Sequence, residues 1–203
     1  MTIKEAINQA VIMLKNENID APKNKARMLL EATLKKSKEY LIIYDNKEIT
    51  PQERELYIKN VKKHILGEPI QYITGKQEFM KLNFFVTKDV LIPRQDTEIL
   101  VEEVIRLAKN IENPMILDLC TGSGAIAVSL AKYINNVKIY ATDISSKAIE
   151  IAKKNAEFNG VKNSIEFIES NLFNKLKDLK FDIIVSNPPY IETETIKTLP
   201  IDV

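Results

Sequence analysis

The 203-residue sequence has little of what builds metal clusters and disulfides. Its one cysteine, Cys120, cannot form an internal disulfide, and its one histidine, His64, cannot assemble a Cys/His metal cluster. No apolar run approaches the roughly 20 residues of a membrane span, and the polar first five residues are unlike a signal peptide. We therefore expect a cytoplasmic protein that binds no metal and has no membrane segment.

An excess of positive charge is also absent. Lys and Arg number 29 against 28 Asp and Glu, which leaves a formal net charge of +1. Because non-specific binding to nucleic acid depends on such an excess, we expect no direct nucleic-acid partner. The chain is 45% hydrophobic and 28% charged. This composition excludes wholesale disorder, and the length allows one or two domains.

Glycine is scarce, with five in the whole sequence, and two of them, Gly122 and Gly124, lie two residues apart. A glycine lets the backbone come close to a ligand because it has no Cβ atom. Residues 120–126 are therefore the first place to look for a ligand contact.

The first 66 residues show helical spacing of apolar positions. Thr50-Pro51-Gln52-Glu53 is the capping box of the fourth expected helix, which runs to about Leu66. The lysine pairs at 35–36 and 62–63 are typical of solvated helix faces, and His64 suits the end of a helix dipole. We assign residues 1–74 to a helical domain and residues 75–95 to a linker with a β-hairpin, whose strands we expect at 77–80 and 83–86.

Strands and helices alternate over the remaining residues, 96–203. We expect Asp96 to cap a helix at 97–109 with a buried stripe of Leu100, Val104 and Leu107, and Ser145 to cap a helix at 146–158. The other expected elements are a helix at 125–134 and strands at 115–119, 137–142, 165–168 and 181–186. This order predicts an α/β protein with a Rossmann-like, doubly wound parallel sheet covered on both faces. Ligands of such sheets bind at the carboxyl ends of the strands.

The segment from Asp118 to Ala127 has the pattern of a strand end, a tight loop and a helix start. Gly122 and Gly124 fit the dinucleotide-binding pattern, and Asp143 can accept hydrogen bonds from both ribose hydroxyls. A pyrophosphate would be repelled by the carboxylate of Asp118, whereas the ammonium of S-adenosylmethionine could be held by it directly or through water. The residues favour S-adenosylmethionine over NAD, with a loop that binds no ligand as the third interpretation.

A second motif, Asn187-Pro188-Pro189-Tyr190, follows the last expected strand. One interpretation is a loop stiffened by prolines, with Tyr190 as a packing residue. The other is catalytic: the Asn187 side-chain carbonyl and the Pro188 backbone carbonyl each accept one N–H of a target NH2 group, and Tyr190 stacks on its plane. Prolines fix such acceptors rigidly, and a positioned nitrogen needs no strong general base before methyl transfer.

With these motifs the sequence resembles the bacterial release-factor glutamine methyltransferases, from about residue 1 to its end. The resemblance is strongest over 67–191 and is carried by the glycine loop and by four further segments: Gly67-Glu68-Pro69-Ile70-Gln71-Tyr72-Ile73-Thr74-Gly75, Glu78-Phe79 with Phe85-Val86, Leu91-Ile92-Pro93-Arg94-Gln95-Asp96-Thr97-Glu98, and Asn187-Pro188-Pro189-Tyr190-Ile191. DNA amino-methyltransferases and ribosomal-protein glutamine methyltransferases share only the last of these.

The resemblance implies methylation of the side-chain amide nitrogen of the glutamine in the Gly-Gly-Gln motif of class 1 peptide chain release factors. It implies that the target glutamine lies on Asn187, Pro188, Pro189 and Tyr190, and that the N-terminal helices help to dock the release factor. It also implies contacts with the donor, S-adenosylmethionine, at Cys120, Thr121, Gly122, Ser123, Gly124, Asp143, Asn171, Leu172 and Asn187, to which the charge argument above adds Asp118. We expect the complete enzyme to be a monomer.

Three features depart from the family pattern. The family usually has glycine at the position of Cys120 and an acidic residue at the position of Asn171. Family members also continue for roughly half a domain more, so we expect the sheet to be truncated at its C-terminus. Two alternatives stay open: a ribosomal-protein glutamine or DNA amino-methyltransferase, and an inactive protein that only binds the donor or the release factor.

Overall fold

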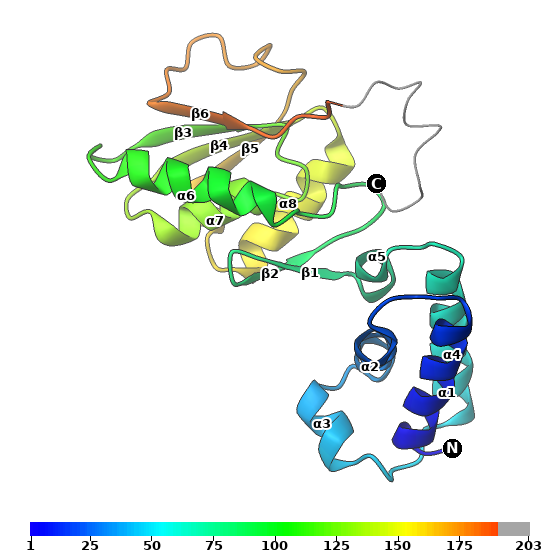
Figure 1. Ribbon diagram of the computed structural model, residues 1–203. Coiled ribbons are helices and arrows are strands. Elements are labelled where there is room, and N and C mark those ends of the chain that lie inside the picture. The colour runs from blue at the N-terminus through cyan, green and yellow to red at the C-terminus, as the bar shows by residue number, and fades with distance from the viewer. Residues whose placement is uncertain (191–203) are drawn as a thin grey trace. The chain divides into compact units, whose positions relative to one another are not determined.

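The computed structural model describes residues 1–190, which divide into two compact units (Figure 1). The first unit spans Met1–Thr74, and the second begins at Gly75. The final part of the expected methyltransferase domain, Ile191 of the proline motif included, lies outside the described residues. Among residues 1–190, no helix is long and apolar enough to cross a membrane.

The first unit is built from helices around a core that includes Leu29, Leu30 and Tyr57. The phenolic hydroxyl of Tyr57 is enclosed in this core and donates to the carbonyl of Ala26 at 2.9 Å, so burial leaves no polar group of this side chain unpaired. The helices are α1 (Ile3–Asn16), α2 (Pro22–Leu34), α3 (Lys38–Ile43), α4 (Pro51–Ile65) and α5 (Ile70–Thr74). The short α5 was not predicted from the sequence.

Local sequence fixes where the two longest of these helices begin. Thr50 accepts from the backbone N–H of Glu53 while Glu53 accepts from that of Thr50, which confirms the predicted capping box. Thr2 and Glu5 make the same pair at the start of α1.

The second unit contains a four-stranded parallel sheet in the order β5-β4-β3-β6. Its strands are β3 (Met115–Leu119), β4 (Lys138–Asp143), β5 (Ile165–Glu169) and β6 (Ile183–Ser186). The helices are α6 (Asp96–Ala108), α7 (Ala125–Tyr133) and α8 (Ser146–Phe158), with a short 3-10 helix, η1 (Lys162–Ser164). The strand order reverses at β3, as in a doubly wound sheet, so the crevice at β3 and β6 is the expected ligand position.

The expectation of helices on both faces of the sheet is wrong for the described residues. Helices α6, α7 and α8 pack with one face, where Ile116, Ile139 and Val185 belong to the same core (Figure 1). On the opposite face, Leu117 and Tyr140 pack with side chains of the 170–181 segment, such as Leu176. An irregular segment thus covers the face for which a helix was predicted.

Helix α6 also corrects the sequence interpretation. It begins at Asp96, after a helical Gln95, so Asp96 is the first residue of the helix and not its cap. The buried stripe is Val101, Val104 and Ala108, whereas Leu107 is 46% exposed and Leu100 is only partly buried. Two overlapping apolar stripes have helical spacing in this segment, and packing against the sheet selects the second.

The hairpin of β1 (Lys76–Phe79) and β2 (Leu82–Phe85) belongs to the second unit. Met80 and Lys81 both have positive φ, as the two-residue turn of a tight hairpin requires. Phe79 and Phe84 are 1% exposed and meet edge to face, with ring centroids 6.0 Å apart. The segment that we expected to be a linker, 75–95, therefore contributes to the core of this unit.

One buried amide ties the hairpin to the rest of the unit. Asn155, on α8, is fully buried, and its Oδ1 accepts from the Phe85 N–H at 2.7 Å. Its Nδ2 donates to the Phe85 carbonyl at 3.0 Å and to the Ser123 carbonyl at 2.8 Å. A single side chain thereby joins β2, α8 and the glycine loop.

Replacing this amide tests its structural role. We expect Asn155→Ala to lower the free energy of unfolding by about 2–4 kcal/mol, because three backbone groups lose their partner where the amide was buried. Asn163→Ala, at an exposed position in η1, is the control and should change it by less than about 0.5 kcal/mol. Chemical denaturation measures both, and equal effects of the two variants would contradict this role.

Candidate functional site

The parallel register gathers the predicted site residues at one edge of the sheet. Leu119 pairs with Thr142 on β4 and with Ser186 on β6, and Asp143 pairs with Glu169 on β5. The residues that follow these strand ends are therefore neighbours along the carboxyl edge: the glycine loop after β3, Asn171 and Leu172 after β5, and the proline motif after β6.

The glycine loop has left-handed backbone at alternate residues, with φ of +64° at Cys120, +55° at Gly122 and +78° at Gly124. A Cβ on Gly124 would lie 2.9 Å from the Cβ of Ala152 on α8, so this glycine permits close packing of the loop on the helix. A Cβ on Gly122 would meet nothing within 4 Å. Gly122 therefore leaves open space where a ligand can approach the backbone.

Cys120 stands at a position whose backbone favours glycine. Its φ of +64° explains why glycine is the residue expected there, since a side chain costs about 1–2 kcal/mol in this conformation. The thiol is partly buried, and burial together with the nearby charge of Asp143 raises its pKa. The cysteine thus keeps the loop conformation at a cost in stability and is poorly suited to be a thiolate nucleophile.

Asp118, at the end of β3, binds the glycine loop on its buried side. Its carboxyl group is fully buried, and Oδ2 accepts from the Thr121 hydroxyl at 2.6 Å and from the Ala127 N–H at 3.1 Å. Burial and, to a smaller extent, the charge of nearby Asp143 raise its pKa to about 6, against the opposing effect of these two hydrogen bonds. Because the Asp118 carboxyl group is enclosed, it contacts the loop directly and is not exposed to the open space beside Gly122.

Asp143, the last residue of β4, also binds the glycine loop. One carboxylate oxygen accepts from the Gly122 N–H at 2.9 Å and the other accepts from the Ser145 N–H at 2.9 Å. Each oxygen can accept a further hydrogen bond, and the side chain is only partly buried. Asp143 can therefore hold the loop and bind ligand hydroxyls at the same time.

The turn after β5 presents Asn171 and Leu172 to solvent. Leu172 has φ of +46° and is 52% exposed, and its carbonyl accepts from the Ser170 hydroxyl at 3.0 Å. The Ser170 oxygen also accepts from the Lys175 N–H at 3.2 Å. Ser170, which sequence reasoning missed, is thus the buried side chain that shapes this turn.

The proline motif leaves β6 with its side chains accessible. Asn187 is half-buried and its Nδ2 donates to the hydroxyl oxygen of Thr97 at 3.2 Å, whereas Pro188 and Pro189 are exposed. Tyr190 is 83% exposed, so its ring is not packed into the core of the part of the chain that the structure describes.

A small cavity joins the glycine loop to Asn187. Its walls include Thr97, Cys120, Gly122 and Ser123, and its volume of about 60 Å³ is that of about two water molecules. A cavity of this volume does not enclose a molecule the size of S-adenosylmethionine.

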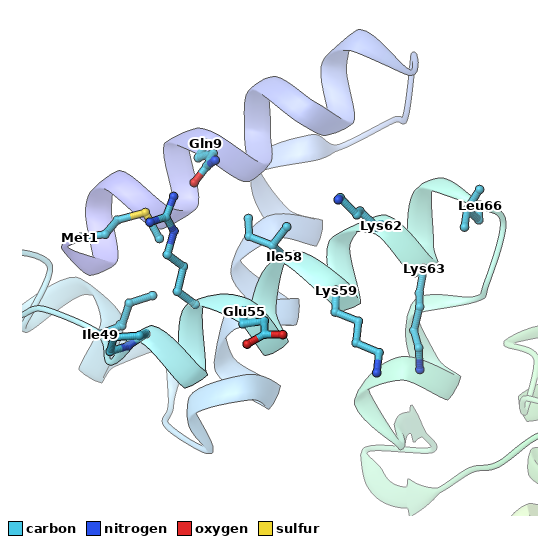
Figure 2. Close-up of a pocket in the computed structure, with 11 residues that line it drawn as sticks. Met1, Gln9, Ile49, Glu55, Ile58, Lys59, Lys62, Lys63 and Leu66 are labelled. Atoms are coloured by element: carbon cyan, nitrogen blue, oxygen red, sulfur yellow. The ribbon is translucent and has the colours of Figure 1, made fainter.

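A larger groove lies in the first unit, between α1 and α4 (Figure 2). Its volume is about 800 Å³, and apolar side chains such as Ile49 and Ile58 contribute to it. Among the described residues its charged lining is mostly basic, with Arg54, Lys59, Lys62 and Lys63 beside one acidic residue, Glu55. None of the predicted site residues lines this groove.

Comparison with known proteins places both units in described families. Residues 5–75 match the PrmC N-terminal domain, and residues 95–199 match the methyltransferase small domain. A release factor glutamine methyltransferase of Moorella thermoacetica is 39% identical over 203 residues, which are 100% of this chain and 72% of the relative. One of Fusobacterium nucleatum is 40% identical, and the match covers 96% of this chain and 55% of the relative.

Among solved structures, the ribosomal protein L11 methylase of Lactobacillus delbrueckii subsp. bulgaricus is similar at 29% identity with a TM-score of 0.43. The match covers 51% of this chain and 51% of that one.

The open space above Gly122 leads to a prediction about the donor. We expect Gly122→Ala to weaken binding of S-adenosylmethionine by at least tenfold, because the new methyl group occupies the approach to the loop. Isothermal titration calorimetry measures this.

Gly160→Ala is the matched control, because Gly160 also has positive φ (+73°) and also faces open space. Both variants should lose about 1 kcal/mol of stability, but only Gly122→Ala should lose affinity. Equal donor affinities in the two variants would show that the ligand does not approach this loop.

Proposed function

The chain belongs to the release factor glutamine methyltransferase family, and on this basis we propose that it methylates the side-chain amide nitrogen of the glutamine in the Gly-Gly-Gln motif of class 1 release factors. The proposal rests on the arrangement of residues at the carboxyl edge of the sheet. There, one cavity is lined both by the glycine loop and by Asn187. The reaction is expected in the cytoplasm.

The residues of this edge fit S-adenosylmethionine, the family's methyl donor, which when bound supplies a methyl group on a positively charged sulfur. Asp118 and Asp143 surround the loop with negative charge, and Oδ1 of Asp118 is buried without a hydrogen-bond partner within the described residues. Such surroundings suit a cationic ligand and oppose a pyrophosphate. Asp143 has capacity left for ribose hydroxyls, and Gly122 leaves room at the backbone.

The proline motif supplies the acceptors for the target amide. An amide nitrogen is a weak nucleophile because its lone pair is delocalised, so its position decides the rate. Oδ1 of Asn187 and the carbonyl of Pro188 each accept one N–H, and the exposed ring of Tyr190 stacks on the amide plane. When the N–CH3 bond forms, the nitrogen gives up one proton to solvent, which explains why a strong base is not needed beforehand.

The first unit offers a surface for the release factor. The α1–α4 groove combines apolar side chains with a mostly basic lining, a combination that suits an acidic protein segment with apolar anchors (Figure 2). A nucleic acid bound only through its phosphates would not need the apolar part of this surface.

Transfer of a radiolabelled methyl group tests the function and its alternatives. We expect label on purified class 1 release factor, and none on ribosomal protein or DNA. Asn187→Ala should reduce kcat by about 10²-fold or more at saturating donor, because the target loses an acceptor, while donor affinity changes less. Wild-type protein that binds the donor and labels no release factor would contradict the proposal.

Charge reversal tests the groove. We expect Arg54→Glu combined with Lys62→Glu to raise KM for the release factor by about tenfold, with kcat and donor affinity unchanged. Lys23→Glu with Lys38→Glu makes the same change in net charge at exposed positions outside the groove and should leave KM within about twofold. An equal rise in KM for both pairs would show that only net charge matters.

A further inference from the structure

Thr97 lies where the start of α6 meets the end of β6. Its backbone N–H donates to the Arg94 carbonyl at 3.1 Å, and its side chain lines the cavity that also contains Asn187. The hydroxyl oxygen accepts from Nδ2 of Asn187 at 3.2 Å. Residues far apart in sequence therefore meet in one hydrogen bond at the proposed methyl-acceptor position.

In this hydrogen bond the Asn187 amide turns its donor end toward Thr97. An asparagine side chain has a donor end, Nδ2, and an acceptor end, Oδ1, of nearly the same shape. A target NH2 group needs an acceptor, so an Asn187 amide turned the other way would present N–H to N–H. Engaging Nδ2 with Thr97 leaves Oδ1 as the end that is available to the target.

The helix turn that carries Thr97 is anchored to the hairpin. The Glu98 N–H donates to the Gln95 carbonyl at 2.8 Å, and the Glu98 carboxylate accepts from the Met80 N–H at 2.6 Å. The first turn of α6 is thereby tied to the turn of the hairpin, whose Phe79 and Phe84 are in the core. The hydroxyl is held by a rigid element, as precise positioning requires.

We propose that Thr97 is a positioning residue that anchors the Asn187 amide through Nδ2, which leaves Oδ1 for the glutamine to be methylated. This inference rests on the proposed function, because it assumes that Asn187 accepts from the target. It adds a residue of α6 to the cavity that Asn187 also lines. In this role Thr97 acts on the target through Asn187.

The test compares Thr97→Val, which removes the hydroxyl at nearly constant volume, with Thr97→Ser, which keeps it. We expect Thr97→Val to lower kcat by about tenfold, with donor affinity and KM for the release factor unchanged, and Thr97→Ser to restore most of the rate. In an Asn187→Ala background, Thr97→Val should have no further effect. Wild-type kcat in Thr97→Val, or an equal loss in both Thr97 variants, would overturn the inference.

A readout independent of turnover separates this inference from the proposed function. In ¹⁵N spectra, the side-chain NH2 resonances of Asn187, assigned by their absence in Asn187→Ala, should shift in Thr97→Val and stay close to wild type in Thr97→Ser. Unchanged resonances in Thr97→Val, with wild-type protein active on release factor, would overturn this inference alone. Wild-type protein that labels no release factor would overturn both.

Discussion

The site depends on one backbone constraint, the left-handed conformation of alternate residues in the loop between β3 and α7. Three of the five residues from Cys120 to Gly124 have positive φ, a conformation that the two glycines adopt readily and that Cys120 adopts only where its surroundings enforce it. Two carboxylates do so here: Asp118 binds the loop and the start of α7 from the buried side, and Asp143 binds the Gly122 N–H from β4. The charge that holds the loop is also the charge that suits a sulfonium ligand.

The rest of the second unit brings further groups to this loop. The parallel register aligns the ends of β3, β4, β5 and β6, so the segments that follow them share one edge. Asn155 joins the loop to the hairpin, and Thr97 joins α6 to the proline motif. Donor side and acceptor side are thus linked by single buried or half-buried side chains with defined hydrogen bonds.

Much of this arrangement is readable from the sequence, because its signals are local. The bounds of β3 and α8 match those predicted, and the Ser145 cap and the Thr50 capping box are present. The glycine loop falls where the pattern puts it, β3 and β6 end at the predicted residues, and β4 and β5 each end one residue later than predicted. These features depend on neighbours within a few residues, which a sequence shows directly.

Features that depend on contacts between distant residues could not be predicted. In the sequence, Asn155 looks like any polar residue of an amphipathic helix, because its partner, Phe85, lies 70 residues away. The same holds for Thr97, which lies 90 residues from Asn187, and for the stripe of α6 that packs inward. The enclosure of Asp118 is a further case, since a strand pattern does not show what covers its end.

A crystal structure of the protein with S-adenosylhomocysteine, the donor without its methyl group, tests the central claim most directly. We expect the ligand at the carboxyl edge, with its ribose hydroxyls within hydrogen-bond distance of Asp143 and its sulfur on the side of Asn187. A ligand bound away from the glycine loop, or a sulfur remote from the proline motif, would contradict the claim that this edge brings donor and target amide together.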